Sequence, residues 1–140
     1  MTDLVIDASV AIKWVIEEHG TREAISLRRH RLFAPELLVA ECANVLWKKT
    51  RRNELTPDEA RLAARLLQRA DVELAPMRAL LEPTTELAIA MDHPAYDCAY
   101  LALAESLSCN LVTADRKLSA KQLPQGYKSK VLGLTANALP

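Results

Sequence analysis

The chain has 140 residues, the length of a single domain, and half of them are hydrophobic, which is enough for one core. Its 18 basic residues balance 18 acidic ones, so the formal net charge is zero. This balance excludes a strongly basic nucleic-acid-binding protein but is compatible with a local basic patch. We therefore expect one domain that spans residues 1–140.

The cysteines and the N-terminal segment indicate the cellular compartment. Cys42, Cys98 and Cys109 are odd in number and lack C-x-x-C spacing, which favours free thiols over a disulfide framework or a zinc site. The first residues include Asp3 and a short apolar run, unlike a basic signal peptide, and no apolar run reaches membrane-spanning length. We expect a soluble, cytoplasmic protein with no membrane contact.

Short apolar segments alternate with helical patterns along the chain. Strands are expected over 4–6, 32–34, 72–75, 111–113 and 131–134. Two helices follow each of the first three strands: 9–15 and 21–31, then 35–52 and 57–70, then 83–91 and 95–107. One helix, over 114–121, follows the fourth strand. Thr21 is expected to cap the second helix, and Thr56 forms a capping box with Glu59. This alternation predicts an α/β fold, a three-layer sandwich around a mainly parallel five-stranded sheet.

One helical segment combines an apolar surface with a single charge. Residues 95–104 read Ala-Tyr-Asp-Cys-Ala-Tyr-Leu-Ala-Leu-Ala, and a helix that is apolar on nearly every side is normally buried. Its one charge is Asp97, and aspartate is almost never fully buried unless it is paired or bound to a cation. The segment therefore predicts a carboxylate that another group must compensate.

Three further acids occupy positions from which they can meet Asp97. Asp7 directly follows the first predicted strand, Asp115 follows the fourth, and Glu41 lies on the helix after the second strand, beside its apolar stripe. In parallel α/β sheets, sites form outside the carboxyl ends of the strands. If the first and fourth strands are neighbours, all four acids can share one crevice.

Each acid also has a simpler interpretation on its own. Asp7 and Asp115 can be N-caps, Glu41 a solvated helix residue, and Asp97 a first-turn acid favoured by the helix dipole. Four acids in one crevice, however, repel one another and need a counter-charge. Oxygen ligands suit Mg²⁺ or Mn²⁺, which activate water and stabilise the oxygens of a phosphodiester. We therefore predict that these four residues are both metal ligands and catalytic residues.

Four segments carry a more specific pattern: Asp7-Ala-Ser, Pro35-Glu-Leu with Glu41 and Asn44 after it, Tyr96-Asp-Cys-Ala-Tyr-Leu-Ala-Leu-Ala, and Leu111-Val-Thr-Ala-Asp-Arg-Lys-Leu. In content and order, these segments resemble the PIN-domain nucleases. They resemble more closely the VapC toxins of type II toxin–antitoxin pairs, over essentially the whole chain.

This resemblance implies a set of functional properties. The family's acidic residues correspond to the four acids named above, and Ser9 and Thr113 match its small hydroxyl positions beside the site. The family cleaves RNA with Mg²⁺ or Mn²⁺, and a cognate VapB-like antitoxin holds it inactive. The resemblance thus implies a metal-dependent endoribonuclease with an RNA substrate and an antitoxin partner, commonly as a homodimer.

Basic and aromatic residues add weaker signals. Lys48 shares a helix face with Glu41 and Asn44, and Arg116 and Lys117 follow Asp115, so these cations are candidates for binding RNA phosphates. The remaining basic residues of the helices over 35–52 and 57–70 are either solvated, dipole-favoured side chains or a track for RNA phosphates, and the sequence leaves both interpretations open. The histidines His19, His30 and His93 have no ligand spacing and are expected to be structural or exposed. Core or interface positions are expected for Trp14, Trp47, Tyr96 and Tyr100.

Other functions with acids at strand ends fit less well. A receiver-type signalling module needs an aspartate after its third strand and a lysine after its fifth, where this chain has Ala75-Pro76 and Thr135. A dehalogenase-type phosphatase needs Asp-x-Asp after its first strand, and Asp7-Ala8-Ser9 lacks the second acid. The remaining alternative is a catalytically inactive RNA- or protein-binding module on the PIN fold.

Overall fold

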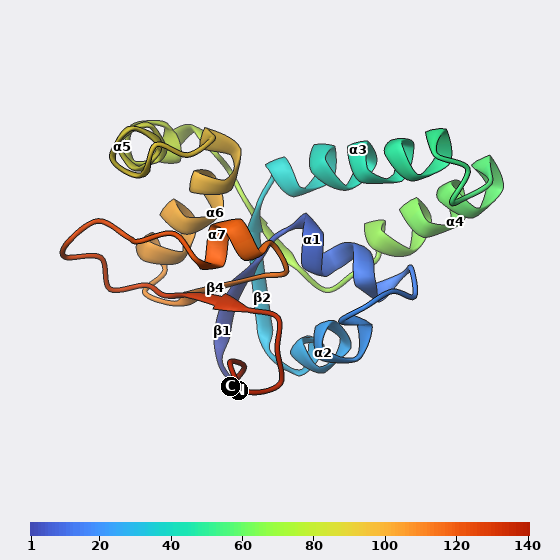
Figure 1. The fold of residues 1–140 in the computed structure, drawn as a ribbon, viewed down its shortest axis with the longest axis horizontal. Coiled ribbons are helices and arrows are strands. Elements are labelled where there is room, and N and C mark those ends of the chain that lie inside the picture. The colour runs from blue at the N-terminus through green and yellow to red at the C-terminus, as the bar shows by residue number, and fades with distance from the viewer.

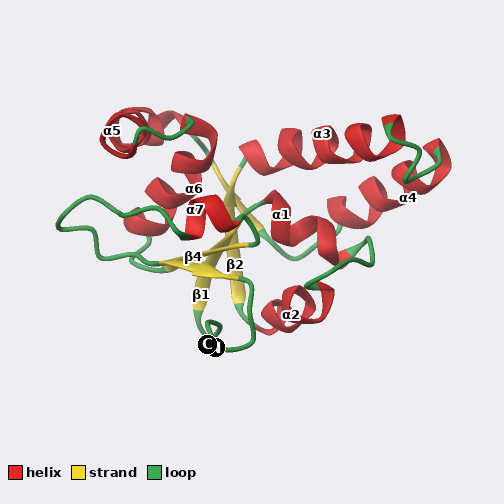
Figure 2. Ribbon diagram, viewed as in Figure 1, coloured by secondary structure: helices red, strands yellow, loops and turns green.

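The computed structural model describes residues 1–140 and contains a five-stranded sheet in which every pairing is parallel (Figure 2). Its strands are β1 (Asp3–Ile6), β2 (Arg31–Pro35), β3 (Glu73–Ala75), β4 (Asn110–Thr113) and β5 (Val131–Gly133). The spatial order is β3-β2-β1-β4-β5, so the chain reverses its direction of progress between β1 and β4. The predicted sheet is confirmed, and β1 and β4 are the neighbours that the predicted crevice requires.

Helices cover both faces of this sheet. They are α1 (Ala8–Ala11), α2 (Thr21–Ser26), α3 (Leu37–Arg51), α4 (Pro57–Gln68), α5 (Leu81–Met91), α6 (Ala95–Ser106) and α7 (Arg116–Ser119), with short 3₁₀ turns at Ile12–Trp14, Leu27–Arg29 and Arg78–Leu80. Figure 1 shows α5 and α6 on one side of the strands and α1 to α4 on the other, which makes the predicted three layers. None of the helices has the combination of length and hydrophobicity that crossing a membrane requires.

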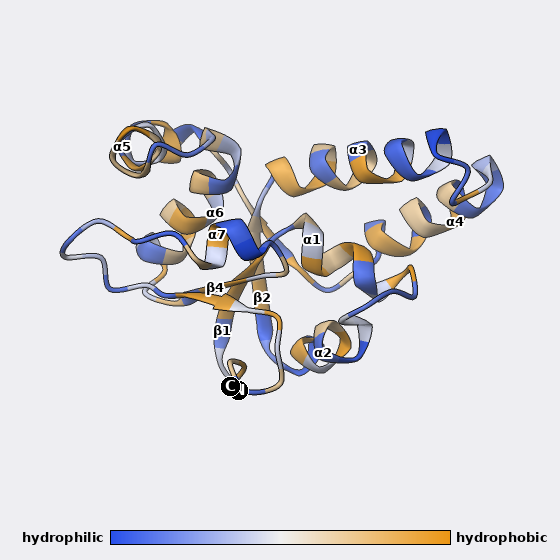
Figure 3. Cartoon of the chain, viewed as in Figure 1, coloured by the Kyte–Doolittle hydropathy of each residue, from blue (hydrophilic) through white to orange (hydrophobic).

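Helix α6 is the centre of the hydrophobic core. Every residue from Cys98 to Ala104 is buried, and the helix packs against β1, β2 and β4. Figure 3 shows hydrophobic residues along the strands and hydrophilic residues at the far end of the α3–α4 pair, where it projects from the sheet. The structure thus confirms that the helix carrying Asp97 is a core helix, and all three cysteines are free.

Two local predictions need correction. Thr21 is not the N-cap of α2, because Gly20 takes that position with a φ of 91°, which a residue with a side chain rarely adopts. The Thr21 hydroxyl instead accepts a hydrogen bond from the Glu18 N–H and donates one to the Ile16 carbonyl. Helix α5 begins at Leu81, two residues before the predicted Pro83, because proline is tolerated in the first turn.

Candidate active site

Two hydroxyl groups hold the carboxylate of Asp7 at the carboxyl end of β1. Ser9 Oγ donates to Asp7 Oδ1 at 2.5 Å, and Thr113 Oγ1 donates to Asp7 Oδ2 at 2.5 Å. Asp7 is 5% exposed, so its carboxylate lies almost wholly inside the protein. Asp7 occupies the N-cap position of α1, but its side chain makes no capping hydrogen bond. Its two carboxylate oxygens are bound by the Ser9 and Thr113 hydroxyls instead.

The same hydroxyls connect Asp7 to the loop between β4 and α7. Ala114 N donates to Ser9 Oγ at 2.9 Å, and Asp115 N donates to Thr113 Oγ1 at 3.0 Å. Each hydroxyl thus accepts a hydrogen bond from a backbone N–H and donates its own O–H to one carboxylate oxygen of Asp7. These hydrogen bonds link the segment that follows β1 to the end of the neighbouring strand β4. They therefore fix the start of α1 relative to the end of β4. We call Asp7, Ser9 and Thr113 the hydroxyl clamp.

Burial dominates the electrostatics of Asp7. It raises the pKa of this carboxyl to about 6, against the opposing hydrogen bonds from Ser9 and Thr113, and the charge of Asp97 raises it further. The hydroxyl clamp therefore stabilises the ionised form only in part. A positive charge at this place would favour ionisation of Asp7.

Asp97 enters the site from the first turn of α6 and is paired with His93. His93 Nε2 lies 2.7 Å from Asp97 Oδ2, and the His93 side chain is only 9% exposed. In the tautomer that carries its proton on Nε2, the imidazole donates this hydrogen bond to the carboxylate. His93 precedes Pro94, the N-cap residue of α6, and the pair therefore fixes Asp97 from just outside its own helix.

Glu41 reaches the site from α3, where a core tyrosine binds it. The phenol of Tyr100 donates to Glu41 Oε1 at 2.5 Å. Burial raises the pKa of Glu41 and the Asp97 charge adds to this effect, whereas the Tyr100 hydrogen bond lowers the pKa. Burial and the charge of Glu41 also raise the pKa of Tyr100, which keeps its proton and remains a donor.

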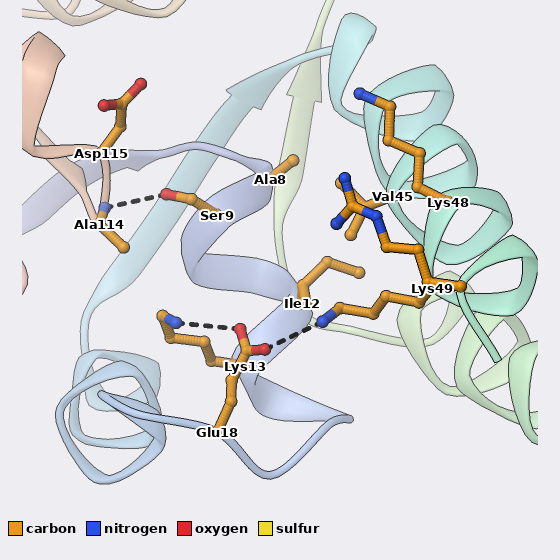
Figure 4. Close-up of a pocket in the computed structure, with 11 residues that line it drawn as sticks. Ala8, Ser9, Ile12, Lys13, Glu18, Val45, Lys48, Lys49, Ala114 and Asp115 are labelled. Atoms are coloured by element: carbon orange, nitrogen blue, oxygen red, sulfur yellow. Dashed lines mark hydrogen bonds and ion pairs between the residues drawn. The ribbon is translucent and has the colours of Figure 1, made fainter. Parts of the chain in front are cut away.

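Asp115 has a different environment from the other three acids. Its Oδ1 accepts a hydrogen bond from Lys117 N, so this carboxylate does cap α7, as one interpretation of the sequence had it. Asp115 is not among the charges that shift the pKa of Asp7 or Glu41, whereas Asp97 acts on both. The structure therefore brings Asp7, Glu41 and Asp97 together electrostatically and leaves Asp115 at the rim, where it lines a pocket with Ser9 (Figure 4).

The donor set suits a hard divalent cation, although the side chains are not arranged as a closed metal site. No three Asp, Glu, His or Cys side chains stand close enough together to hold an ion. The acids that converge offer only carboxylate oxygens, the ligand type of Mg²⁺ and Mn²⁺, which retain several waters when bound. Burial and the charge of Asp97 disfavour ionised Asp7 and Glu41, a penalty that a cation would relieve.

The remaining predicted residues lie around this centre. Asn44 is exposed on α3, and its side chain makes no hydrogen bond to the acids. Lys48 is exposed on α3 and lines the same pocket as Asp115. Arg116 and Lys117 are exposed at the start of α7.

The sequence had given His93 a structural or exposed position and Tyr100 a core or interface role. Tyr100 lies three residues after Asp97 on α6, and residues at this spacing share a helix face, so its spacing was an available signal. His93 lies four residues before Asp97 but outside α6, so helix periodicity offered no signal for it. Tyr100 is indeed a core residue, with no exposed surface, but its hydroxyl also reaches Glu41.

This parallel α/β fold, with carboxylates gathered where the strand order reverses, defines a class of protein with an acidic site at a topological switch point. The PIN domain family matches residues 4–122. Ribonuclease VapC9 from Mycobacterium tuberculosis is 35% identical over 116 residues, which cover 83% of this chain and 88% of that protein. The chain therefore belongs to the PIN domain family, and its similarity to VapC ribonucleases extends over most of both chains.

Solved structures agree with this assignment. The crystal structure of PAE2754 from Pyrobaculum aerophilum has a TM-score of 0.69 at 25% identity, covering 91% of this chain and 89% of that one. A toxin–antitoxin complex from Klebsiella pneumoniae contains a chain with a TM-score of 0.67 at 13% identity, covering 94% of this chain and 98% of that one. The latter likeness is one of fold.

Replacing Asp7 by Asn tests the buried carboxylate. The folded pKa of about 6 lies above the ordinary value of 3.8, so between these values the folded state retains a proton that the unfolded state releases. The wild-type free energy of unfolding should therefore fall, through this group, by about 2 kcal/mol between about pH 4 and pH 7. In urea denaturation without divalent cations, the free energy of unfolding of Asp7→Asn should therefore rise relative to that of wild type by about 2 kcal/mol between about pH 4 and pH 7.

A matched variant controls for general charge effects. Asp92 is exposed at the C-cap of α5 in a left-handed conformation that asparagine tolerates. The free energy of unfolding of Asp92→Asn should differ from that of wild type by the same amount at both pH values. A difference between Asp7→Asn and wild type that does not change with pH would contradict the raised pKa.

Replacing Tyr100 by Phe tests whether its hydroxyl positions Glu41. The variant keeps the ring in the core and removes the hydrogen bond to Glu41 Oε1. Loss of a partner that orients a metal ligand typically costs about 10–100-fold in metal affinity or activity. We expect Mn²⁺ affinity, measured by calorimetry, to fall about tenfold. Tyr96→Phe is the control, since Tyr96 is 67% exposed, and equal affinities in the two variants would exclude the positioning role.

Proposed function

We propose that this protein is a metal-dependent endoribonuclease that acts in the cytoplasm as the toxin of a VapBC-type toxin–antitoxin pair. The observation that carries the proposal is the buried Asp7 carboxylate held between the ends of β1 and β4, in a chain of the PIN domain family. The charge of Asp97 acts on this carboxylate and on Glu41 of α3. The name of its relative, ribonuclease VapC9, supports RNA as the substrate.

The proposed ligands of Mg²⁺ or Mn²⁺ are Asp7, Glu41 and Asp97, with Asp115 at the rim of the same site. A bound divalent cation would supply a water of lowered pKa and offset the negative charge that develops on the phosphodiester oxygens. The chain's own contribution is to hold the carboxylates ready for this chemistry. All four residues are thus proposed as catalytic through the metal.

Each of the three converging acids has a partner that restricts its movement. Ser9 and Thr113 fix both oxygens of Asp7, the His93 imidazole fixes Asp97, and the Tyr100 phenol fixes Glu41. Partners of this kind orient metal ligands and contribute to affinity. We therefore assign Ser9 and Thr113 a supporting role and add His93 and Tyr100 as positioning residues.

An apolar groove supports an antitoxin partner. The cavity of about 480 Å³ beside α3 and α4 is lined by 13 residues, of which 12 are hydrophobic, including Leu38, Val39 and Ala64. An amphipathic helix binds such a groove through apolar side chains on one face. We propose that a VapB-like antitoxin places a helix here, and that one of its arginines binds the carboxylates in place of the metal.

A second apolar surface supports a homodimer. Leu81 and Ile89 on α5 are 71% and 77% exposed, and Tyr96 at the start of α6 is 67% exposed. We propose that this surface forms a symmetric dimer interface. Of the two tryptophans, Trp14 is half-buried and donates its indole N–H to the Ala24 carbonyl, whereas Trp47 on α3 is 53% exposed. A monomeric mass in light scattering over a wide concentration range would contradict the dimer.

Replacing Asp97 by Asn separates the enzyme from a catalytically inactive PIN-fold binding module. We expect cleavage of single-stranded RNA in Mg²⁺ or Mn²⁺ to fall by orders of magnitude, with the fold retained in circular dichroism. Asp92→Asn, which removes the same charge from an exposed site nearby, should cleave like wild type. Wild-type cleavage by a folded Asp97→Asn variant, or full activity in excess chelator, would exclude the metal-dependent mechanism.

The antitoxin mechanism makes a prediction about metal affinity. If an antitoxin arginine occupies the carboxylates, the complex should bind Mg²⁺ more weakly than the free protein in calorimetry, and co-expression should abolish toxicity. The variant Ala64→Arg, in the apolar groove, should lose inhibition and keep cleavage. Equal Mg²⁺ affinity in both states would exclude the arginine mechanism and leave an antitoxin that blocks RNA entry.

A further inference from the structure

A pocket of about 430 Å³ opens directly beside the proposed catalytic centre. Ser9 and Asp115 line it on the side of the site, and Lys48, Lys49 and Arg52 line it from α3. Figure 4 shows Asp115 on one side, Lys48 and Lys49 on the other, and α1 between them. The pocket therefore runs from the acidic site to a basic helix face.

The charges of this pocket differ from those of the whole chain. Its lining includes the cations Lys13, Lys48, Lys49 and Arg52 and the acids Glu18 and Asp115, which is a local excess of positive charge in a chain whose formal net charge is zero. A concave surface lined by one sign of charge concentrates ions of the opposite sign. The excess therefore favours an anionic ligand next to the acids.

Ion pairs divide these cations into two groups. Glu18 accepts hydrogen bonds from Lys13 Nζ at 2.9 Å and from Lys49 Nζ at 3.2 Å, so one carboxylate holds two ammonium groups (Figure 4). Lys48 and Arg52 have no acidic partner and are exposed. These two side chains are therefore free to bind an anion without first breaking an ion pair.

We propose that this pocket is a subsite for RNA backbone phosphates flanking the scissile bond, with Lys48 and Arg52 as the phosphate ligands. The proposal rests on the proposed ribonuclease function and deepens it. A strand that passes Asp115 enters the pocket and meets the α3 wall, where the two free cations compensate its phosphodiester charges. Glu18 has the complementary role of keeping Lys13 and Lys49 in place along the same wall.

The test measures RNA binding separately from cleavage. Asp97→Asn serves as the parent because it should not cut the probe, a fluorescently labelled single-stranded RNA followed by anisotropy at several KCl concentrations. Each phosphate contact contributes about 0.7 to the slope of log K against log[salt] for a single strand. Adding Lys48→Gln and Arg52→Gln should lower the slope by about 1.4 and the affinity at about 0.1 M salt by about 25-fold.

The control removes the same charge elsewhere. Lys128 and Lys130 are exposed and precede β5, at the edge of the sheet opposite the carboxyl ends of the strands. Lys128→Gln with Lys130→Gln should leave the slope and the affinity at the parent values, and melting curves should show that every variant is folded. A similar loss of RNA affinity in both double variants would show that net charge alone causes the effect. That result would overturn the proposed subsite.

The remaining outcomes keep this proposal separate from the proposed function. If wild type cleaves RNA but Lys48→Gln with Arg52→Gln binds like the parent, the subsite is wrong and the ribonuclease function stands. If the double variant loses antitoxin binding and retains RNA binding, the pocket recognises an acidic protein segment and the proposal is overturned. If wild type cleaves no RNA in either metal, the ribonuclease function itself fails.

Discussion

The hydroxyl clamp on Asp7 is the interaction on which the rest of the site depends. Asp7 directly follows β1 and Thr113 ends β4, so the Thr113 hydrogen bond joins the two strands between which the chain reverses its progress across the sheet. Ser9 binds the same carboxylate from the start of α1. The backbone N–H groups of the β4–α7 loop bind the same hydroxyls and fix where Asp115 leaves the strand. One buried carboxylate thereby sets the geometry of the crevice.

Helix α6 solves the difficulty of placing charge next to a hydrophobic core. Its middle is fully buried, while Asp97 in its first turn remains partly accessible and Tyr100, one turn later, reaches Glu41 from inside the core. A buried hydroxyl without a hydrogen-bond partner is destabilising. The Tyr100–Glu41 bond therefore stabilises the core and also orients the Glu41 carboxylate. The same helix therefore serves stability and the proposed chemistry.

The sequence predicted the sheet and the core helix because each depends on a strong local rule, namely apolar strands and apolar helix periodicity. It predicted four acids in one crevice, and in the structure the charge of Asp97 raises the pKa of Asp7 and Glu41 while no three acidic side chains stand close enough to hold an ion. It did not predict the role of Tyr100, because its bond to Glu41 joins residues 59 positions apart on α6 and α3. The role of His93 was also missed, because the residue lies outside α6, where helix periodicity gives no signal. The sequence left Asp115 as either a helix N-cap or an acid of the site. In the structure it caps α7 and also lines the pocket beside the site. The Glu18 bridge joins residues 31 positions apart, beyond any local pattern.

The pKa of Asp7 is the quantity that tests this account most directly, because it reports burial, the hydroxyl clamp and the proposed cation together. Carbon-13 NMR of the aspartate carboxyls would follow it during a pH titration, first without divalent cations and then with millimolar Mg²⁺. We expect a pKa of about 6 in the absence of cations and a clear decrease when Mg²⁺ is present. A pKa near the ordinary aspartate value, unchanged by Mg²⁺, would contradict both the buried carboxylate and the metal site.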